Sequence, residues 1–200
     1  MIWKRFLGAK PRNPNALPLY RAIVAQARQP GLYRDLGVPD NLDGRFEAIV
    51  LHLVLVLRRL KRDFPAGRDL AEALQESFFE DMDHSLRELG AGDLGVGKRV
   101  KRMAEGFMGR LAGYEGALDR LAVEGEAAAL RAALRRNVFG TLPEAEGDLA
   151  GLVAYVLAQA AALDAQPGEA LRLGRVAFAP APDGAESGPP MAAGGPLQGD

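Results

Sequence analysis

Acidic side chains and a histidine lie close together between positions 80 and 84, where their types and spacing come closest to known chemistry. Glu80 and Asp81 precede His84 by four and three residues, so all three share one face of a helix. Asp83 adds a further carboxylate. A di-metal helical bundle needs this pattern on two helices, and the only other histidine, His52, lacks an acid at such spacing. The cluster is therefore interpreted as an acidic surface, with a metal-dependent helical enzyme as the alternative.

A glycine-rich stretch, Gly92 to Lys98, matches the first seven positions of a phosphate-binding loop. The next residue is Arg99, where such a loop needs Ser or Thr for Mg²⁺, and the stretch follows a helical pattern rather than a strand. We expect these glycines to form a turn between helices. The chain also has no cysteine, which excludes thiolate metal sites and cysteine nucleophiles. No cofactor and no catalytic residue is expected.

Four cations occupy the five positions that follow Gly97 at the start of a predicted helix. Cations there oppose the helix dipole, at about 0.3–1 kcal/mol each when exposed. Three interpretations stay open: ion pairs with the acidic cluster, contact with an acidic partner or anionic lipid, and an RNA- or ribosome-associated adaptor. RNA is the weakest, because no aromatic side chains alternate with the charges. The predicted partner-binding residues are Lys98, Arg99, Lys101, Arg102, Phe107, Met108, Glu80, Asp81 and Asp83.

The same predicted helix carries Gly106, Gly109, Gly113 and Gly116 in its interior. Each costs about 1 kcal/mol relative to Ala, so their presence calls for a reason. Close approach of another helix is one reason, and flexibility is another. The approaching helix is either the segment 43–62 of this chain or a helix of a partner.

Helical periodicity covers most of the chain, and no strand pair with hairpin chemistry is evident. The predicted fold is all-α, a single compact domain of about six helices over residues 14–175. The segment 43–62 is apolar on all sides in its middle, which is typical of a buried central helix. The tail, residues 176–200, is rich in Pro, Gly and Ala and is predicted to be disordered. The other predicted helices are 17–28, 67–89, 94–121, 124–138 and 147–163, with a short helical turn at 32–36.

The net charge of the chain is −1, which excludes a global electrostatic attraction to nucleic acid. The N-terminal residues 1–13 form an amphipathic segment. No signal peptide is evident, and no apolar run approaches the ~20 residues that a membrane span needs. The segment either packs on the domain or contacts a membrane surface. The predicted membrane-contacting residues are Ile2, Trp3, Phe6 and Leu7.

Several blocks agree in order with one known family: residues 19–28, 33–37, 43–53 and 79–114. In these blocks, which include Asp81-Met82-Asp83, the chain resembles a bacterial member of the ubiquinol–cytochrome c chaperones, assembly factors of the cytochrome bc1 complex. The resemblance covers about residues 1–172.

This resemblance implies an all-helical protein that is not an enzyme and that binds newly made cytochrome b as its client. It also implies a location in the bacterial cytoplasm, peripheral at the inner face of the cytoplasmic membrane, where an anionic membrane surface is a further expected contact. Mitochondrial members act with a small partner, so a second assembly factor is a candidate partner here. No specific nucleic acid is expected. The metal-binding enzyme and the RNA- or ribosome-associated adaptor remain the alternatives.

Overall fold

A computed structural model describes residues 13–88, 93–140, 142 and 147–182, and within these ranges the chain is helical without strands. This confirms the all-α fold. Residues 1–12, with the predicted membrane-contacting side chains, and residues 183–200 lie outside the described ranges. The helices are α1 Ala16–Ala27, α2 Pro30–Arg34, α3 Leu42–Arg62, α4 Arg68–Glu88, α5 Asp93–Glu124, α6 Ala128–Asn137, α7 Leu149–Asp164 and α8 Gly168–Arg172.

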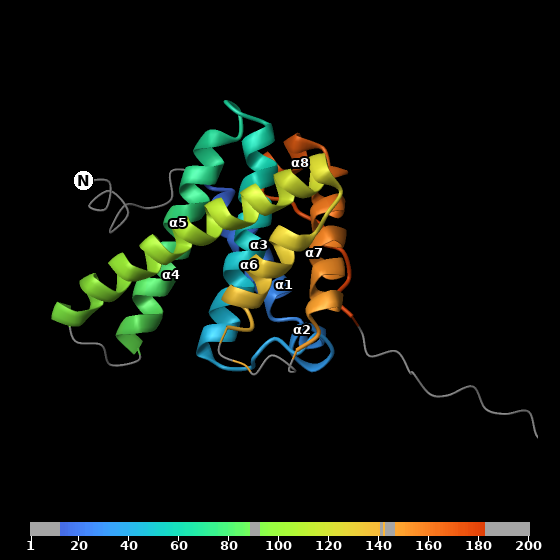
Figure 1. Cartoon of the computed structure of the whole chain (residues 1–200). Coiled ribbons are helices and arrows are strands. Elements are labelled where there is room, and N and C mark those ends of the chain that lie inside the picture. The colour runs from blue at the N-terminus through green and yellow to red at the C-terminus, as the bar shows by residue number, and fades with distance from the viewer. Residues whose placement is uncertain (1–12, 89–92, 141, 143–146, 183–200) are drawn as a thin grey trace, which may run out of the picture.

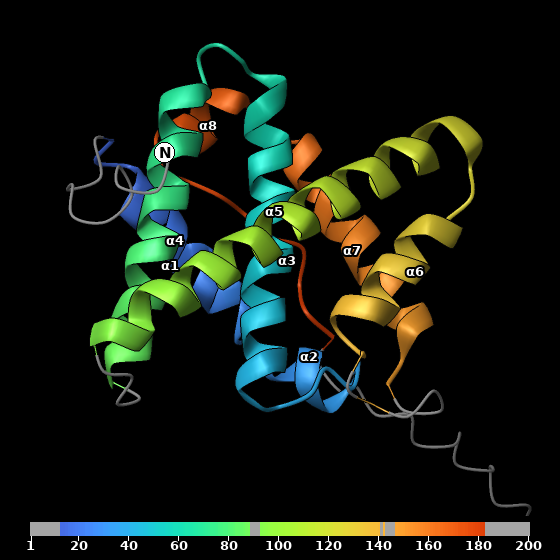
Figure 2. The same cartoon turned by 60° about the vertical axis from the view of Figure 1, so that its left-hand side comes forward.

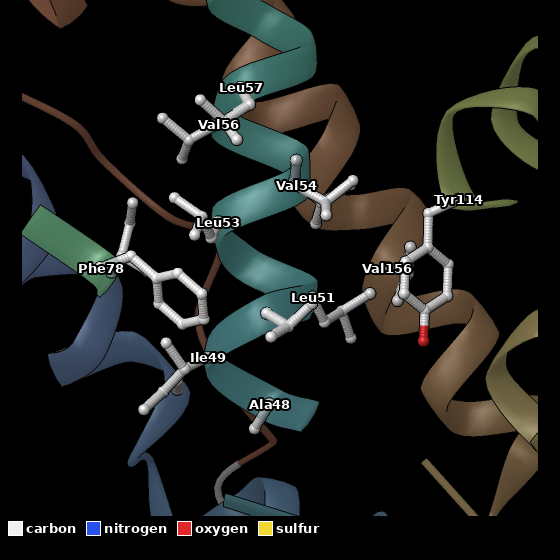
Figure 3. Close-up of a cluster of buried hydrophobic side chains, with 14 of the residues drawn as sticks. Ala48, Ile49, Leu51, Leu53, Val54, Val56, Leu57, Phe78, Tyr114 and Val156 are labelled. Atoms are coloured by element: carbon white, nitrogen blue, oxygen red, sulfur yellow. The ribbon is translucent and has the colours of Figure 1, made fainter. Parts of the chain in front are cut away.

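Helix α3 is the central element, and it contacts α1, α4, α5, α7 and α8 (Figure 1). Its first turn is capped by the Asn41 side chain, which accepts a hydrogen bond from the Gly44 backbone N–H at 2.9 Å. Every residue from Ala48 to Leu57 is buried, because neighbouring helices cover α3 on all sides. Figure 3 shows these side chains packing toward Phe78 on one side and Tyr114 on the other. The predicted central helix is therefore confirmed.

Helix α5 crosses the C-terminal end of α4 and the middle of α3, and α6 then runs back beside α5 (Figure 2). The turn between α5 and α6 contains Gly125 with φ of +73°, a conformation that residues with a side chain rarely adopt. No helix in the described ranges is both long enough and apolar enough to cross a bilayer.

The end of the domain differs from the sequence expectation. Helix α8 turns the chain back, and residues 175–182 follow in an extended form. Gln159 of α7 exchanges two hydrogen bonds with the Ala179 backbone, at 2.7 and 2.9 Å. Gln166 exchanges two with Ala177, at 2.7 and 2.8 Å. Residues 176–182 thus belong to the domain rather than to a disordered tail, because α7 supplies the partners that their backbone needs.

Beneath this extended segment, His52 of α3 is completely buried in a hydrogen-bonded group that we call the sealed cluster (Gln26, His52, Tyr155, Gln159). Its Nδ1 donates to the Ala48 carbonyl at 2.7 Å, so Nε2 accepts from the Tyr155 hydroxyl, also at 2.7 Å. Gln26 donates to Tyr155 Oη at 2.9 Å. Burial lowers the pKa of His52 to about 4, which keeps the imidazole neutral at pH 7.

Candidate functional site

A groove of about 1520 Å³ lies where α2, the start of α3 and the end of α4 meet α5 and α6. Figure 2 shows the elements concerned, with α5 lying across the other helices. Concave sites that combine apolar side chains with polar groups are typical binding sites, and this groove has both, with many charged side chains in its lining. The apolar lining residues are Leu42, Phe46, Ile49, Met82, Met103 and Val138.

An ion pair between Glu47 of α3 and Arg110 of α5 forms the polar centre of the groove. The Arg110 Nε donates to both carboxylate oxygens, at 2.9 and 2.7 Å, and its Nη2 also contacts Oε1. The guanidinium also lies 5.7 Å from the centre of the Phe46 ring. Burial raises the pKa of Glu47, while Arg110 opposes that shift. The pair therefore holds α5 against α3, and Arg110 occupies both carboxylate oxygens of Glu47.

Gly106 is the α5 glycine with a clear role in this arrangement. Its carbonyl accepts a hydrogen bond from Arg110 Nη1 at 3.1 Å, and a Cβ at this position would lie 2.9 Å from the same nitrogen. Gly109 and Gly116 have nothing within 4 Å of an added Cβ. The expectation that they allow close packing on the segment 43–62 is therefore wrong, because no neighbour within the described chain approaches them.

The structure buries one of the two predicted apolar contact residues of α5 and exposes the other. Phe107 is fully buried, with ring centres 5.3 Å from Phe78 and 5.7 Å from Phe79. The prediction that Phe107 contacts a partner at the surface is therefore wrong, because Phe107 packs against these aromatic rings inside the domain. Met108 is 55% exposed and stays available, although it does not line the groove.

The predicted acidic surface on α4 is divided between several environments. Asp81 lines the groove and accepts a hydrogen bond from the Tyr20 hydroxyl at 2.7 Å. Asp83 forms an ion pair with Arg87 one turn along, also at 2.7 Å. Glu80 is half-buried, and burial, assisted by the charge of Glu76, raises its pKa. Only Asp81 of these three reaches the groove.

The metal-dependent alternative depended on Glu80, Asp81, Asp83 and His84, all of which the structure describes. Within the described ranges, no three His, Asp or Glu side chains are grouped so as to hold a metal ion. A helical face alone is not sufficient, because three ligands must converge on one point. The structure thus gives the metal site no support on these residues.

The predicted basic residues lie at the start of α5, but their side chains are outside the described part of the chain: Lys98, Arg99, Lys101 and Arg102. Sequence reasoning missed the Glu47–Arg110 pair and the groove itself. One signal was present, a lone acid at position 47 just before the longest apolar run of the chain. Its partner lies 63 residues away, and spacing alone does not predict such a contact.

A solved structure shares this fold, and proteins with known names are similar in sequence. The crystal structure of the Cbp3 homolog from Brucella abortus is 42% identical, covers 84% of this chain and 90% of that chain, and superposes with a TM-score of 0.74. The ubiquinol-cytochrome-c reductase complex assembly factor 1 of Xenopus laevis is 28% identical over 82% of this chain and 80% of its own length. The human protein of that name is also 28% identical, and the match spans 54% of it.

The family comparison covers the groove and most of the domain. The ubiquinol-cytochrome C chaperone family matches residues 34–178, a span that runs from the end of α2 into the extended segment after α8. It includes both members of the Glu47–Arg110 pair and the sealed-cluster residues His52, Tyr155 and Gln159. The chain therefore belongs to the ubiquinol-cytochrome C chaperone family.

Proposed function

We propose that this protein is a non-enzymatic assembly chaperone of the ubiquinol–cytochrome c reductase (bc1) complex and that cytochrome b is its client. Family membership and relatives named as assembly factors of that reductase complex support the role. The observation that carries the client is the groove, whose volume is about 1520 Å³ and whose walls include Leu42, Met82 and Met103. A membrane-protein client presents apolar helices that need cover before assembly.

The groove suits a client held without chemistry. Methionine side chains adapt to different apolar shapes, so Met82 and Met103 tolerate more than one packing arrangement. Asp40 and Arg45 at the rim are exposed and paired with each other at 2.7 Å, and such a pair contributes little to stability. In the proposed mechanism, binding is stoichiometric. The groove covers an apolar surface of the client, and assembly of the complex releases the client.

The test is capture of the client from membranes solubilised in mild detergent, with the tagged full chain as bait and mass spectrometry as readout. Leu42 lines the groove and is 66% exposed, so Leu42→Asp places a charge in the groove without disturbing the core. Val123 is 86% exposed and does not line the groove, which makes Val123→Asp the matched control. We expect cytochrome b with the wild type and with Val123→Asp, and a strong loss with Leu42→Asp. Recovery of other proteins or RNA without cytochrome b would refute the proposed client.

A second contact is proposed for the basic run Lys98, Arg99, Lys101 and Arg102 at the start of α5 and for the amphipathic N-terminal segment. The run would meet acidic groups of the client, a second assembly factor or anionic lipid at the inner face of the cytoplasmic membrane. Changing its four residues together to Glu should impair assembly of the bc1 complex in cells. Unchanged assembly after that reversal would remove the basic run from the mechanism.

A further inference from the structure

Arg136 and Asn137 line one end of the groove, and Tyr114 lies buried beside Asn137. The Asn137 amide is close to the Tyr114 hydroxyl, but neither this hydroxyl nor the Asn137 Nδ2 has a hydrogen-bond partner of normal geometry among the described residues. Arg136, the residue before Asn137, is exposed, lines the groove and forms no ion pair within the described ranges. We call Tyr114, Arg136 and Asn137 the donor corner. Its members range from fully buried through half-buried to exposed.

The carboxylate at the centre of the groove does not satisfy these donors. Glu47 lines the same groove, but Arg110 binds both of its oxygens. Figure 3 shows the Tyr114 ring beside α3, with its hydroxyl oxygen pointing toward the end of the helix that carries Ala48. That is the end at which the groove opens, because Phe46, Glu47 and Ile49 line it. Arg136 and Asn137 thus line the groove, and the Tyr114 hydroxyl lies beside Asn137 without an acceptor of normal geometry in the described chain.

Unpaired buried donors destabilise a folded protein, and most native side chains avoid them. Burial also raises the pKa of Tyr114, so the hydroxyl keeps its proton at neutral pH and acts as a donor. The excess of donors beside a cation is complementary to an oxygen anion. Among groups carried by a protein, a carboxylate offers two oxygens with about four acceptor sites, enough for several donors at once.

We propose that the donor corner binds the carboxylate of an acidic side chain on the apolar helical segment that the groove holds. The proposal rests on the client-binding role proposed above and identifies the feature of the client that is recognised. The carboxylate meets Arg136 first, because this guanidinium is exposed. It then takes the Asn137 amide and the Tyr114 hydroxyl as further donors, and these two atoms, which are covered in the unbound chain, are uncovered as it enters. An acid on an otherwise apolar face is costly to bury unless such donors meet it, so the corner selects segments that carry one.

The probe is a synthetic amphipathic Leu/Lys helix with a single Glu at the centre of its apolar face, and the control peptide has Gln there. Affinity for the full chain is measured by fluorescence anisotropy. We expect the Glu peptide to bind about tenfold more tightly than the Gln peptide, as charge-assisted hydrogen bonds require. Equal affinities, or no binding of either peptide, would overturn the proposal.

Tyr114→Phe separates a binding role from a structural one, since it removes only the unpaired oxygen. We expect this variant to lose about threefold to tenfold of the preference for Glu while its unfolding temperature stays the same or rises. Tyr155→Phe is the matched control, because it removes the same atom from the sealed cluster. It should unfold at a lower temperature and keep the preference. A clear loss of stability in Tyr114→Phe, or a preference that this variant leaves intact, would show that the hydroxyl does not serve the ligand.

Failure of this proposal is distinguishable from failure of the proposed function. If cytochrome b is captured but the peptides show no preference, the donor corner is wrong and the client stands. If the Glu preference depends on Tyr114 but cytochrome b is not captured, the donor corner stands and the client is another acidic apolar segment. Arg136→Gln should weaken binding of the Glu peptide more than binding of the Gln peptide, and an equal effect on both would contradict the role of Arg136.

Discussion

Two buried polar groups flank the central helix, and they differ in how their hydrogen bonds are satisfied. In the sealed cluster, both nitrogens of His52, the Tyr155 hydroxyl and the amide nitrogens of Gln26 and Gln159 all have partners. In the donor corner, the Tyr114 hydroxyl and the Asn137 amide nitrogen have none in the described chain. The paired group holds the chain together, whereas the unpaired group lies beside a groove that Arg136 and Asn137 line.

Acidification should break the sealed cluster, and this is the largest effect we expect. Burial lowers the pKa of His52 from 6.5 to about 4. At pH values between these two, His52 is protonated in the unfolded chain but neutral in the folded chain. The free energy of unfolding should therefore fall by about 3 kcal/mol as the pH drops from 6.5 to 4.

The measurement is urea denaturation of the full chain at a series of pH values. The variant His52→Gln, which lacks the titrating group, should be less stable at pH 7 and show a flatter pH dependence. A wild-type stability that stays level from pH 6.5 to 4 would mean that His52 is not held neutral.

The same chemical change should have opposite consequences in the two groups. Tyr155→Phe removes the donor to His52 Nε2 and one acceptor of Gln26, so it should lower the free energy of unfolding by about 1–3 kcal/mol. Tyr114→Phe removes an unpaired oxygen and should stay within about 0.5 kcal/mol of the wild type. Equal losses in both variants, measured in parallel denaturation curves, would abolish the distinction between the groups.

Substitution of glycines on the two sides of α3 should also change stability in opposite directions, with a smaller effect per residue. Gly109→Ala and Gly116→Ala in α5 should each raise stability by up to about 1 kcal/mol, because an added Cβ meets nothing. On the other side of α3, Gly151→Ala in α7 should lower stability, since its Cβ would clash with Asp148 and lie 2.9 Å from Leu36. Thermal unfolding of the three variants tests this, and destabilisation by the α5 changes would indicate a contact that the described residues do not supply.

The helices were predictable because their signals are local. The apolar middle of the segment predicted the central helix at 43–62, and the structure has it at Leu42–Arg62. Helix α8, with five residues, was too short to show periodicity. The extended segment after it escaped prediction because its stability comes from Gln159 and Gln166 on α7, not from its own sequence.

The site was less predictable because it depends on contacts between distant positions. Phe107 was predicted as a partner contact, because the sequence pattern alone does not tell whether an apolar residue of a helix faces the core or a partner. Tyr114 and Asn137 lie on different helices, and only the fold shows that both remain unpaired beside one groove.

The most direct test of the central claim, that the groove holds the client, is site-specific crosslinking in cells. A photo-reactive amino acid replaces Leu42, which is exposed in the groove, or Val123, which is exposed outside it. We predict that illumination joins cytochrome b to the chain from position 42 and not from position 123. Crosslinks to cytochrome b from position 123 alone, or from neither position, would contradict the assignment of the groove as the client-binding site.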